Sequence, residues 1–176
     1  MASDAQVHIV PYDPGWPIRF EAERQVLLSS IGPWLVGGAV EHIGSTAVPG
    51  LDAKPVIDIM AGVESLDAAR PALPVLERHQ YCYAPYRTEV MHWFCKPSPA
   101  QRTHHLHLVP IGSPLWIERL VFRDYLRAHP DVADEYAALK RRLGETHRFD
   151  REAYTNAKTP FVQRVLRDAW EGDAVR

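Results

Sequence analysis

The sequence has few cysteines and no excess of charge of either sign. Its two cysteines, Cys82 and Cys95, show no CxxC spacing, so neither a zinc knuckle nor a disulfide framework is predicted. The 20 Lys and Arg residues nearly balance the 22 Asp and Glu residues, which leaves a formal net charge of −2. Because nucleic-acid-binding domains usually carry a basic excess, the composition gives no strong nucleic-acid signal.

Long apolar runs are missing as well. No stretch approaches the roughly 20 apolar residues that are needed to cross a bilayer. The N-terminal residues 1–4 lack the basic and then apolar pattern of a secretory signal. We therefore expect no membrane partner and a cytoplasmic location.

What remains is a chain of ordinary globular composition, with 176 residues of which 46% are hydrophobic. This length predicts a single domain over residues 1–176, with an α/β core over 1–112 and a helical extension over 113–176. Alternating and continuous apolar runs predict strands over 40–43, 56–60, 81–84, 90–96 and 103–109. A further short apolar run covers residues 7–10. Helical spacing and capping signals predict helices over 17–30, 65–79, 115–128, 132–147 and 152–170.

The segment 41–59 is the most informative part of the chain. A strand enters the Gly44-Ser45 turn, whose small residues let backbone N–H groups approach a phosphate closely. The next strand carries Asp58 through an otherwise apolar run, and a carboxylate there needs a cation, a metal or hydrogen-bond donors. Lys54, just before that strand, could neutralise a phosphate. The structural alternative is a simple tight turn with Asp58 paired to an arginine.

A histidine pair marks the last predicted strand. His105 and His107 alternate with leucines, so their side chains share one face of the strand. Two imidazoles on one face can bind a metal or hydrogen-bond a substrate. Packing of both rings in a polar sheet face is the alternative.

Three polar residues, Arg123, Tyr154 and Lys158, interrupt the apolar pattern of the C-terminal helices. Tyr154 and Lys158 lie four residues apart and should share a helix face, either in a site or on a solvated surface. The five tryptophans are predicted to fill core and interface positions. They are Trp16, Trp34, Trp93, Trp116 and Trp170.

Taken together, these motifs resemble the GrpB family of bacterial proteins. The matching segments follow in order over nearly the whole chain, at residues 10–16, 42–58, 102–107, 123–127 and 154–158. The family is similar to a branch of the nucleotidyltransferase superfamily, and related domains occur fused to dephospho-CoA kinase. The resemblance implies an α+β, nucleotidyltransferase-like fold, with a mixed sheet of about five strands, flanking helices and a C-terminal helical extension.

In that superfamily a Gly-Ser turn holds the triphosphate, and paired carboxylates on the next strand bind two divalent metals. Asp58 matches the first carboxylate, whereas Met60 stands at the second position and cannot ligate Mg²⁺. We therefore predict Asp58 and His107 as catalytic residues, and Asp58, His105 and His107 as ligands of one divalent metal. Mg²⁺ or Mn²⁺ is expected, with Zn²⁺ less favoured. The predicted nucleotide- or phosphate-binding residues are Gly44, Ser45, Thr46, Lys54, Arg102, Arg123 and Lys158.

Three functional hypotheses follow from this set. The first is an enzyme that binds a nucleotide or other phosphorylated ligand and transfers a nucleotidyl group to a small acceptor. The second is a non-catalytic accessory module that binds a nucleotide or a CoA-type ligand. The third is a degenerate fold used as an interaction surface. The missing second carboxylate favours binding over transfer, and the retained Lys54, Asp58 and histidine pair favour a working site.

Overall fold

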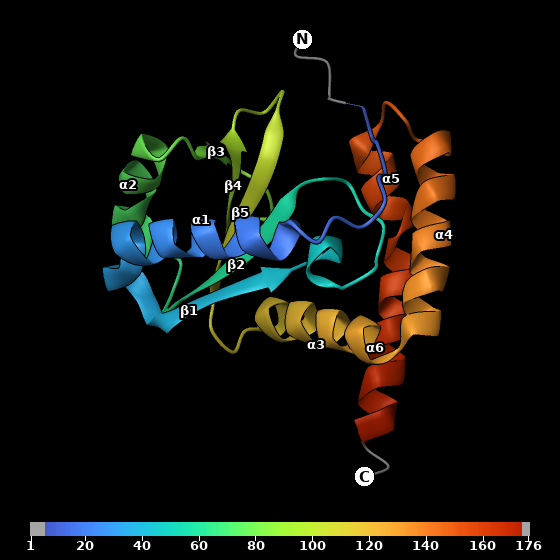
Figure 1. The fold of residues 1–176 in the computed structure, drawn as a ribbon. Coiled ribbons are helices and arrows are strands. Elements are labelled where there is room, and N and C mark those ends of the chain that lie inside the picture. Colours follow the sequence, from blue (N-terminus) through green and yellow to red (C-terminus); the bar gives the residue numbers. More distant parts are fainter. Residues whose placement is uncertain (1–5, 174–176) are drawn as a thin grey trace.

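The computed structural model describes residues 6–173 and shows a mixed five-stranded sheet with helices on both faces (Figure 1). The strand order is β1-β2-β5-β4-β3. The strands are β1 (Leu35–Ile43), β2 (Ile57–Val63), β3 (Cys82–Ala84), β4 (His92–Pro97) and β5 (Arg102–Pro110). The central pair, β2 and β5, is parallel, and every other neighbouring pair is antiparallel.

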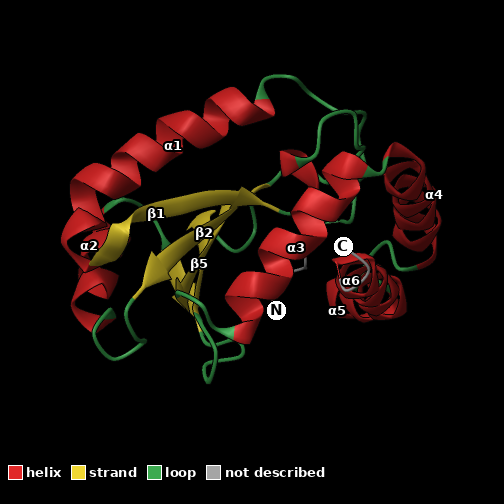
Figure 2. Cartoon of the chain, turned by 90° about the horizontal axis from the view of Figure 1, so that it is seen from below, coloured by secondary structure: helices red, strands yellow, loops and turns green. Residues whose placement is uncertain are grey.

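One face of the sheet is covered by α1 (Trp16–Ile31), and the short α2 (Leu73–Arg78) lies at its far end (Figures 1 and 2). Pro17 stands in the first turn of α1, where its missing N–H costs no hydrogen bond. The main apolar core lies between this layer and the sheet. Its fully buried members include Leu27, Ile59 and Leu106.

The other face is covered by α3 (Pro114–Ala128) (Figure 2). Ser113 caps the start of this helix, since its side chain accepts a hydrogen bond from the backbone N–H of Trp116. Beyond α3 follow α4 (Pro130–Thr146), α5 (Arg151–Ala157) and α6 (Thr159–Asp173), which gather beside one end of the sheet. A second apolar cluster joins α3, α4 and α6 to the loop that carries Val48 and Leu51. The C-terminal helices thereby wall that end of the sheet.

All five predicted strands are present, but the predicted bounds of the first strand and of the helix over 65–79 were wrong. The first strand begins at Leu35; Gly37 and Gly38 adopt positive φ, and the register of β1 against β2 shifts between Leu35 and Val40. The helix predicted over 65–79 reaches only Leu73–Arg78, with turns and a 3₁₀ segment before it. The apolar run 7–10 forms a single bridge, Val10 to Ala53. Within residues 6–173, none of the helices is both long enough and apolar enough to span a membrane.

Candidate functional site

The site begins where β1 ends and β2 begins, since the turn between them lies against Asp58. Ile43 and Asp58 are partners across the two strands, and Gly44 follows with φ +71°. A Cβ built on Gly44 would stand 2.8 Å from Oδ2 of Asp58. Glycine is therefore needed at this position both for its left-handed backbone and for the close approach of the carboxylate.

Gly44→Ala should impair both the fold and the site. The new Cβ must displace the Asp58 carboxylate, and the positive φ adds backbone strain of about 1 to 3 kcal/mol. We expect a lower unfolding midpoint in urea and a loss of ligand binding. Gly50→Ala is the matched control, because it has φ +78° but no atom within 4 Å of its Cβ position. Equal ligand affinity in both variants would contradict the close approach at Gly44.

His105 and His107 both lie on the sheet face of Asp58. His105 is the direct register partner of Asp58 across the parallel β2–β5 pair, and its Nδ1 lies 2.9 Å from Asp58 Oδ1. His107 Nε2 is 3.9 Å from the same oxygen. Because a carboxylate accepts hydrogen bonds and His105 donates here, His105 carries its proton on Nδ1. One carboxylate oxygen is thus fixed by an imidazole, while Oδ2 faces the Gly44 turn.

The electrostatics of this group favour an ionised carboxylate. Burial opposes the ionisation of Asp58, but the imidazoles of His105 and His107 hold its pKa well below the usual range. Burial lowers the pKa of His107, and the Asp58 charge only partly opposes this. The Asp58 side chain keeps 31% of its surface exposed, so it can reach a ligand. Within residues 6–173, the buried Nε2 atoms of His105 and His107 have no hydrogen-bond partner.

Two lysines flank one tyrosine beside this carboxylate. Lys54 precedes β2 and its Nζ lies 5.1 Å from the ring centre of Tyr154, while Lys158 Nζ lies 4.4 Å from the same ring. Lys158 stands at the break between α5 and α6, where a continuous helix over 152–170 was predicted. Burial and then the charge of Lys54 lower the pKa of Lys158 to about 7, with Asp58 acting in the opposite direction.

Two further cations belong to this region, and neither was predicted from the sequence. Besides burial, the positive charge of Arg119 on α3 lowers the pKa of both His107 and Lys158. Lys140 on α4 is 2% exposed and donates to the backbone carbonyl of Asp52. Burial lowers the pKa of Lys140 to about 7.

A signal for Lys140 was present in the sequence. The buried positions of α4 are Ala133, Tyr136, Ala137, Lys140 and Gly144, which repeat with helical spacing. Lys140 occupies an apolar-face position of that repeat, and its Nζ lies 4.8 Å from the Tyr136 ring centre. A lysine on the buried face of an amphipathic helix therefore points to a buried cation. For Arg119 the sequence offers no comparable signal, because its side chain lies on an exposed part of α3.

Three predicted phosphate-binding residues have side chains that are engaged in other contacts within the protein. The Thr46 hydroxyl is buried and lies 2.9 Å from His42 Nε2. Arg123 donates to Glu41 and to the carbonyl of His42, which ties α3 to β1. The guanidinium of Arg102 stacks on Trp93, 5.4 Å from the ring centre. The structure brings together Gly44, Asp58, His105 and His107, and it places Lys54 and Lys158 against the Tyr154 ring. Ser45 directly follows Gly44 in the turn.

The described residues contain no group of three or more His, Cys, Asp or Glu side chains arranged around a metal position. The expected ligands Asp58, His105 and His107 do not form a preformed metal cage. The Nδ1–H of His105 donates a hydrogen bond to Asp58 instead. The donor chemistry still fits a cation that arrives with a ligand. Mg²⁺ is commonly held by one or two carboxylates together with substrate phosphates. The partly exposed Asp58 supplies one such carboxylate.

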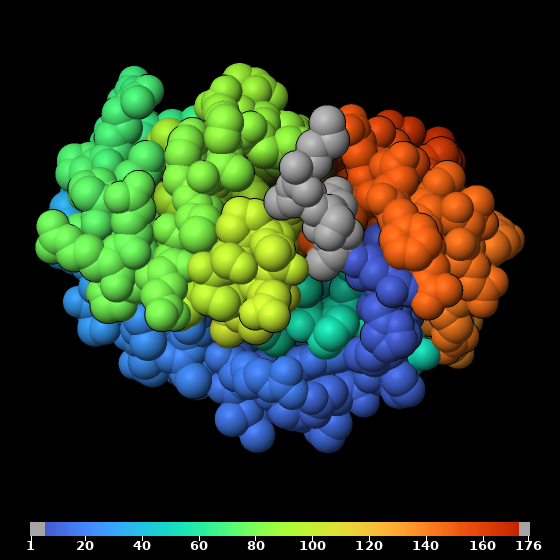
Figure 3. Space-filling view, turned by 90° about the horizontal axis from the view of Figure 1, so that it is seen from above, coloured from blue at the N-terminus to red at the C-terminus, as the bar shows by residue number. Residues whose placement is uncertain are grey.

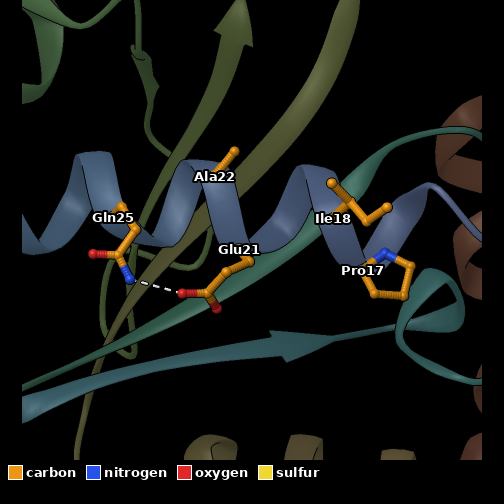
Figure 4. Close-up of a pocket in the computed structure, with 5 residues that line it drawn as sticks. All are labelled: Pro17, Ile18, Glu21, Ala22 and Gln25. Carbon is orange, nitrogen blue, oxygen red and sulfur yellow. Dashed lines mark hydrogen bonds between the residues drawn. The ribbon is translucent and has the colours of Figure 1, made fainter.

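In the space-filling view, the teal segment, which includes part of the loop between β1 and β2, is seen between the yellow β4–β5 region and the blue N-terminal segment (Figure 3). A depression of about 510 Å³ follows the outer side of α1 (Figure 4). Pro17, Ile18, Glu21, Ala22 and Gln25 line it, and Gln25 donates to Glu21 over 2.7 Å. Glu21 is the only ionisable residue that lines this depression, whereas the Asp58 region combines a carboxylate with two imidazoles, so the Asp58 region is the better candidate site.

Fold and site together define an α+β protein with a five-stranded mixed sheet, flanking helices and a C-terminal helical segment, built around a Gly-Ser turn and one carboxylate. The GrpB protein family matches residues 6–168, so the chain belongs to the GrpB family. The crystal structure of conserved protein GrpB from Enterococcus faecalis superposes with a TM-score of 0.84 at 32% sequence identity, covering 94% of this chain and 98% of that one. This match confirms the predicted family and fold class.

Two relatives are longer proteins, and only part of each matches this chain. A UPF0157 protein of Pseudomonas aeruginosa is 40% identical over 170 residues, which cover 94% of this chain and 68% of the relative. A dephospho-CoA kinase of Mycolicibacterium paratuberculosis is 31% identical over 195 residues. The matched region covers 95% of this chain but only 47% of the kinase.

Proposed function

We propose that this protein binds a nucleotide or other phosphorylated small molecule at the Gly44-Ser45 turn. The observation that carries the proposal is a pair of lysines, Lys54 and Lys158, that lie against the Tyr154 ring, together with the effect of the Asp58 charge on the pKa of Lys158. Lys54, Lys158 and Asp58 all keep part of their surface exposed. The local excess of positive charge favours a ligand with several negative charges, such as a phosphate chain.

Phosphate binding beside Asp58 also requires a cation, because an ionised carboxylate repels a phosphate unless a cation lies between them. We propose that a divalent cation, Mg²⁺ or Mn²⁺, enters with the ligand, held by Asp58 and the phosphates. Such a cation would neutralise charge on the phosphates and could support nucleotidyl transfer to a small acceptor. His105 then acts as a positioning residue, since its Nδ1–H holds Asp58 Oδ1 and leaves Oδ2 for the cation.

A second candidate is a non-catalytic module for a CoA-type ligand. The observation that favours it is the matched half of the mycobacterial dephospho-CoA kinase, a protein whose name implies a CoA precursor as its substrate. CoA-type molecules also carry a diphosphate, so they suit the same lysines. Calorimetry with ATP, CTP and dephospho-CoA, each with Mg²⁺, separates the candidates by affinity. Tight binding of dephospho-CoA alone would favour the accessory module.

Lys54→Ala should weaken nucleotide binding by about tenfold, because a charge-assisted hydrogen bond contributes on the order of 1.5 to 3 kcal/mol. Arg70→Ala is a suitable control, since Arg70 pairs with Asp67 on the surface with 69% of its side chain exposed. Equal affinity in Lys54→Ala and wild type would count against the phosphate site.

Lys158 should make ligand affinity depend on pH. Its pKa is about 7 in the free protein, so it loses its charge above that pH, while bound phosphates favour the charged form. Affinity should therefore fall by about tenfold as the pH rises from below the free pKa towards the higher pKa of the bound state. Lys158→Arg keeps its charge throughout and should bind with little change between pH 6 and pH 9. Parallel pH profiles in the two proteins would exclude Lys158 as the titrating group.

A further inference from the structure

An aromatic group on β4 and the loop before it adjoins the Asp58 site. The Trp93 ring lies 5.1 Å from the His105 ring, and His105 is bonded to Asp58. The Tyr86 ring meets Trp93 edge to face, with centroids 6.4 Å apart and planes at 72°. Arg102 stacks its guanidinium on Trp93 from β5. These three residues, Trp93, Tyr86 and Arg102, are called the aromatic platform below.

The platform is open to a ligand. Tyr86 is 51% exposed, and Trp93 is only partly buried. Tyr83, by contrast, packs with Phe94 and His92, whose side chains alternate with Trp93 and so point to the opposite face of the sheet. Trp93 is the β4 partner of His107, so it shares the face of the Asp58 site.

Aromatic rings and a planar guanidinium at the edge of a phosphate site have a specific chemical use. Nucleic-acid bases stack on tryptophan, tyrosine and arginine, and each stack contributes substantially to affinity. A sugar phosphate or inorganic polyphosphate has no ring system for such a contact. A phosphate site with such a platform beside it would therefore favour phosphorylated ligands that carry a base over sugar phosphates and inorganic polyphosphates.

We propose that the aromatic platform binds the base of a nucleotide whose phosphates occupy the Gly44-Ser45 site. This inference rests on the proposed phosphate site and narrows its ligand class to nucleotides and nucleotide-containing cofactors. His105 lies between the two halves, in contact with the Trp93 ring on one side and bonded to Asp58 on the other. In this arrangement the base is bound on β4 and the phosphates are bound at the β1–β2 turn.

The test compares ATP with inorganic tripolyphosphate, each with Mg²⁺, by calorimetry. ATP should bind wild type about tenfold or more tightly than tripolyphosphate, because a stacked base adds affinity of this order. Trp93→Leu should bring the ATP affinity down to the tripolyphosphate value and leave tripolyphosphate binding unchanged. Trp93→Phe should retain most of the ATP preference, since it keeps an aromatic face. Tyr83→Ala on the opposite face is the matched control and should behave as wild type.

Tryptophan fluorescence gives a second readout that a merely structural role of Trp93 would not produce. ATP should quench wild-type emission, and Trp93→Phe should lose this quenching while it still binds ATP. Tyr86→Ala, at an exposed position where misfolding is not expected, should weaken ATP binding but not tripolyphosphate binding. Equal wild-type affinity for ATP and tripolyphosphate would overturn the platform while the phosphate site stands. Binding of neither ligand would overturn both proposals.

Discussion

Asp58→Asn should change the affinity for phosphates in opposite directions with and without a divalent cation. With Mg²⁺, ATP binding should weaken on the order of 10- to 100-fold, since the variant loses the protein carboxylate that would hold the cation. In EDTA, tripolyphosphate should bind more tightly than to wild type, because the variant removes the negative charge that repels it. The fold should persist, as the amide oxygen of asparagine can still accept from His105 Nδ1.

Calorimetry under the two conditions measures this reversal. Asp67→Asn makes the same chemical change at a surface carboxylate whose side chain is 87% exposed, and it should alter neither affinity. Weaker binding of Asp58→Asn in EDTA as well would mean that Asp58 acts without a cation, for example by accepting a hydrogen bond from the ligand. If wild type transfers a nucleotidyl group, the same variant should lose that activity in parallel with its Mg²⁺-dependent binding.

Met60→Asp should strongly destabilise the protein instead of completing a pair of carboxylates. Met60 is fully buried in an apolar cluster with Ile43, Met91, Val109 and Leu115. The substitution removes a buried side chain, which costs about 2 to 5 kcal/mol, and adds the penalty of moving a carboxylate from water into an apolar cluster. Urea unfolding should show the loss directly.

The pH dependence of that variant provides a further check. An aspartate in this cluster has its pKa raised by burial, so the folded state holds its proton more tightly than the unfolded state. The added instability should therefore be smallest below about pH 4, the pKa of an unfolded aspartate, and should grow as the pH rises. Met60→Leu, which nearly conserves volume, should cost less than about 1.5 kcal/mol at every pH. Full stability of Met60→Asp at neutral pH would show that the cluster can open to solvent.

The sequence predicted those parts of the fold that depend on local patterns. Apolar runs and turn residues identified all five strands, and the placement of Gly44 and Asp58 on either side of one loop followed from two adjacent strands. The pairing of His105 with Asp58 depends on which strands become neighbours, which is a tertiary property. Sequence alone placed both residues on strands and left their meeting as a prediction.

The missed residues share one physical reason. The charge of Arg119 acts on His107 from α3, which packs across the sheet face, and Lys140 contacts the Asp52 carbonyl only because α4 is docked beside that loop. Trp93 was predicted to fill a core or interface position, and it does pack against an apolar cluster, but its ring also borders His105 because β4 lies next to β5. In each case packing between distant segments decided the outcome.

The parallel pairing of β2 with β5 also sets the order in which the chain can assemble. Asp58 and His105 are 47 residues apart in sequence, and α2, β3 and β4 lie between them. A contact of this separation must first close a long loop, and such contacts are associated with slow folding. A chain emerging from the ribosome has its Gly44 turn and Asp58 long before β5 exists. During synthesis Asp58 therefore emerges before its imidazole partners, and the contact with His105 can form only after β5 has emerged.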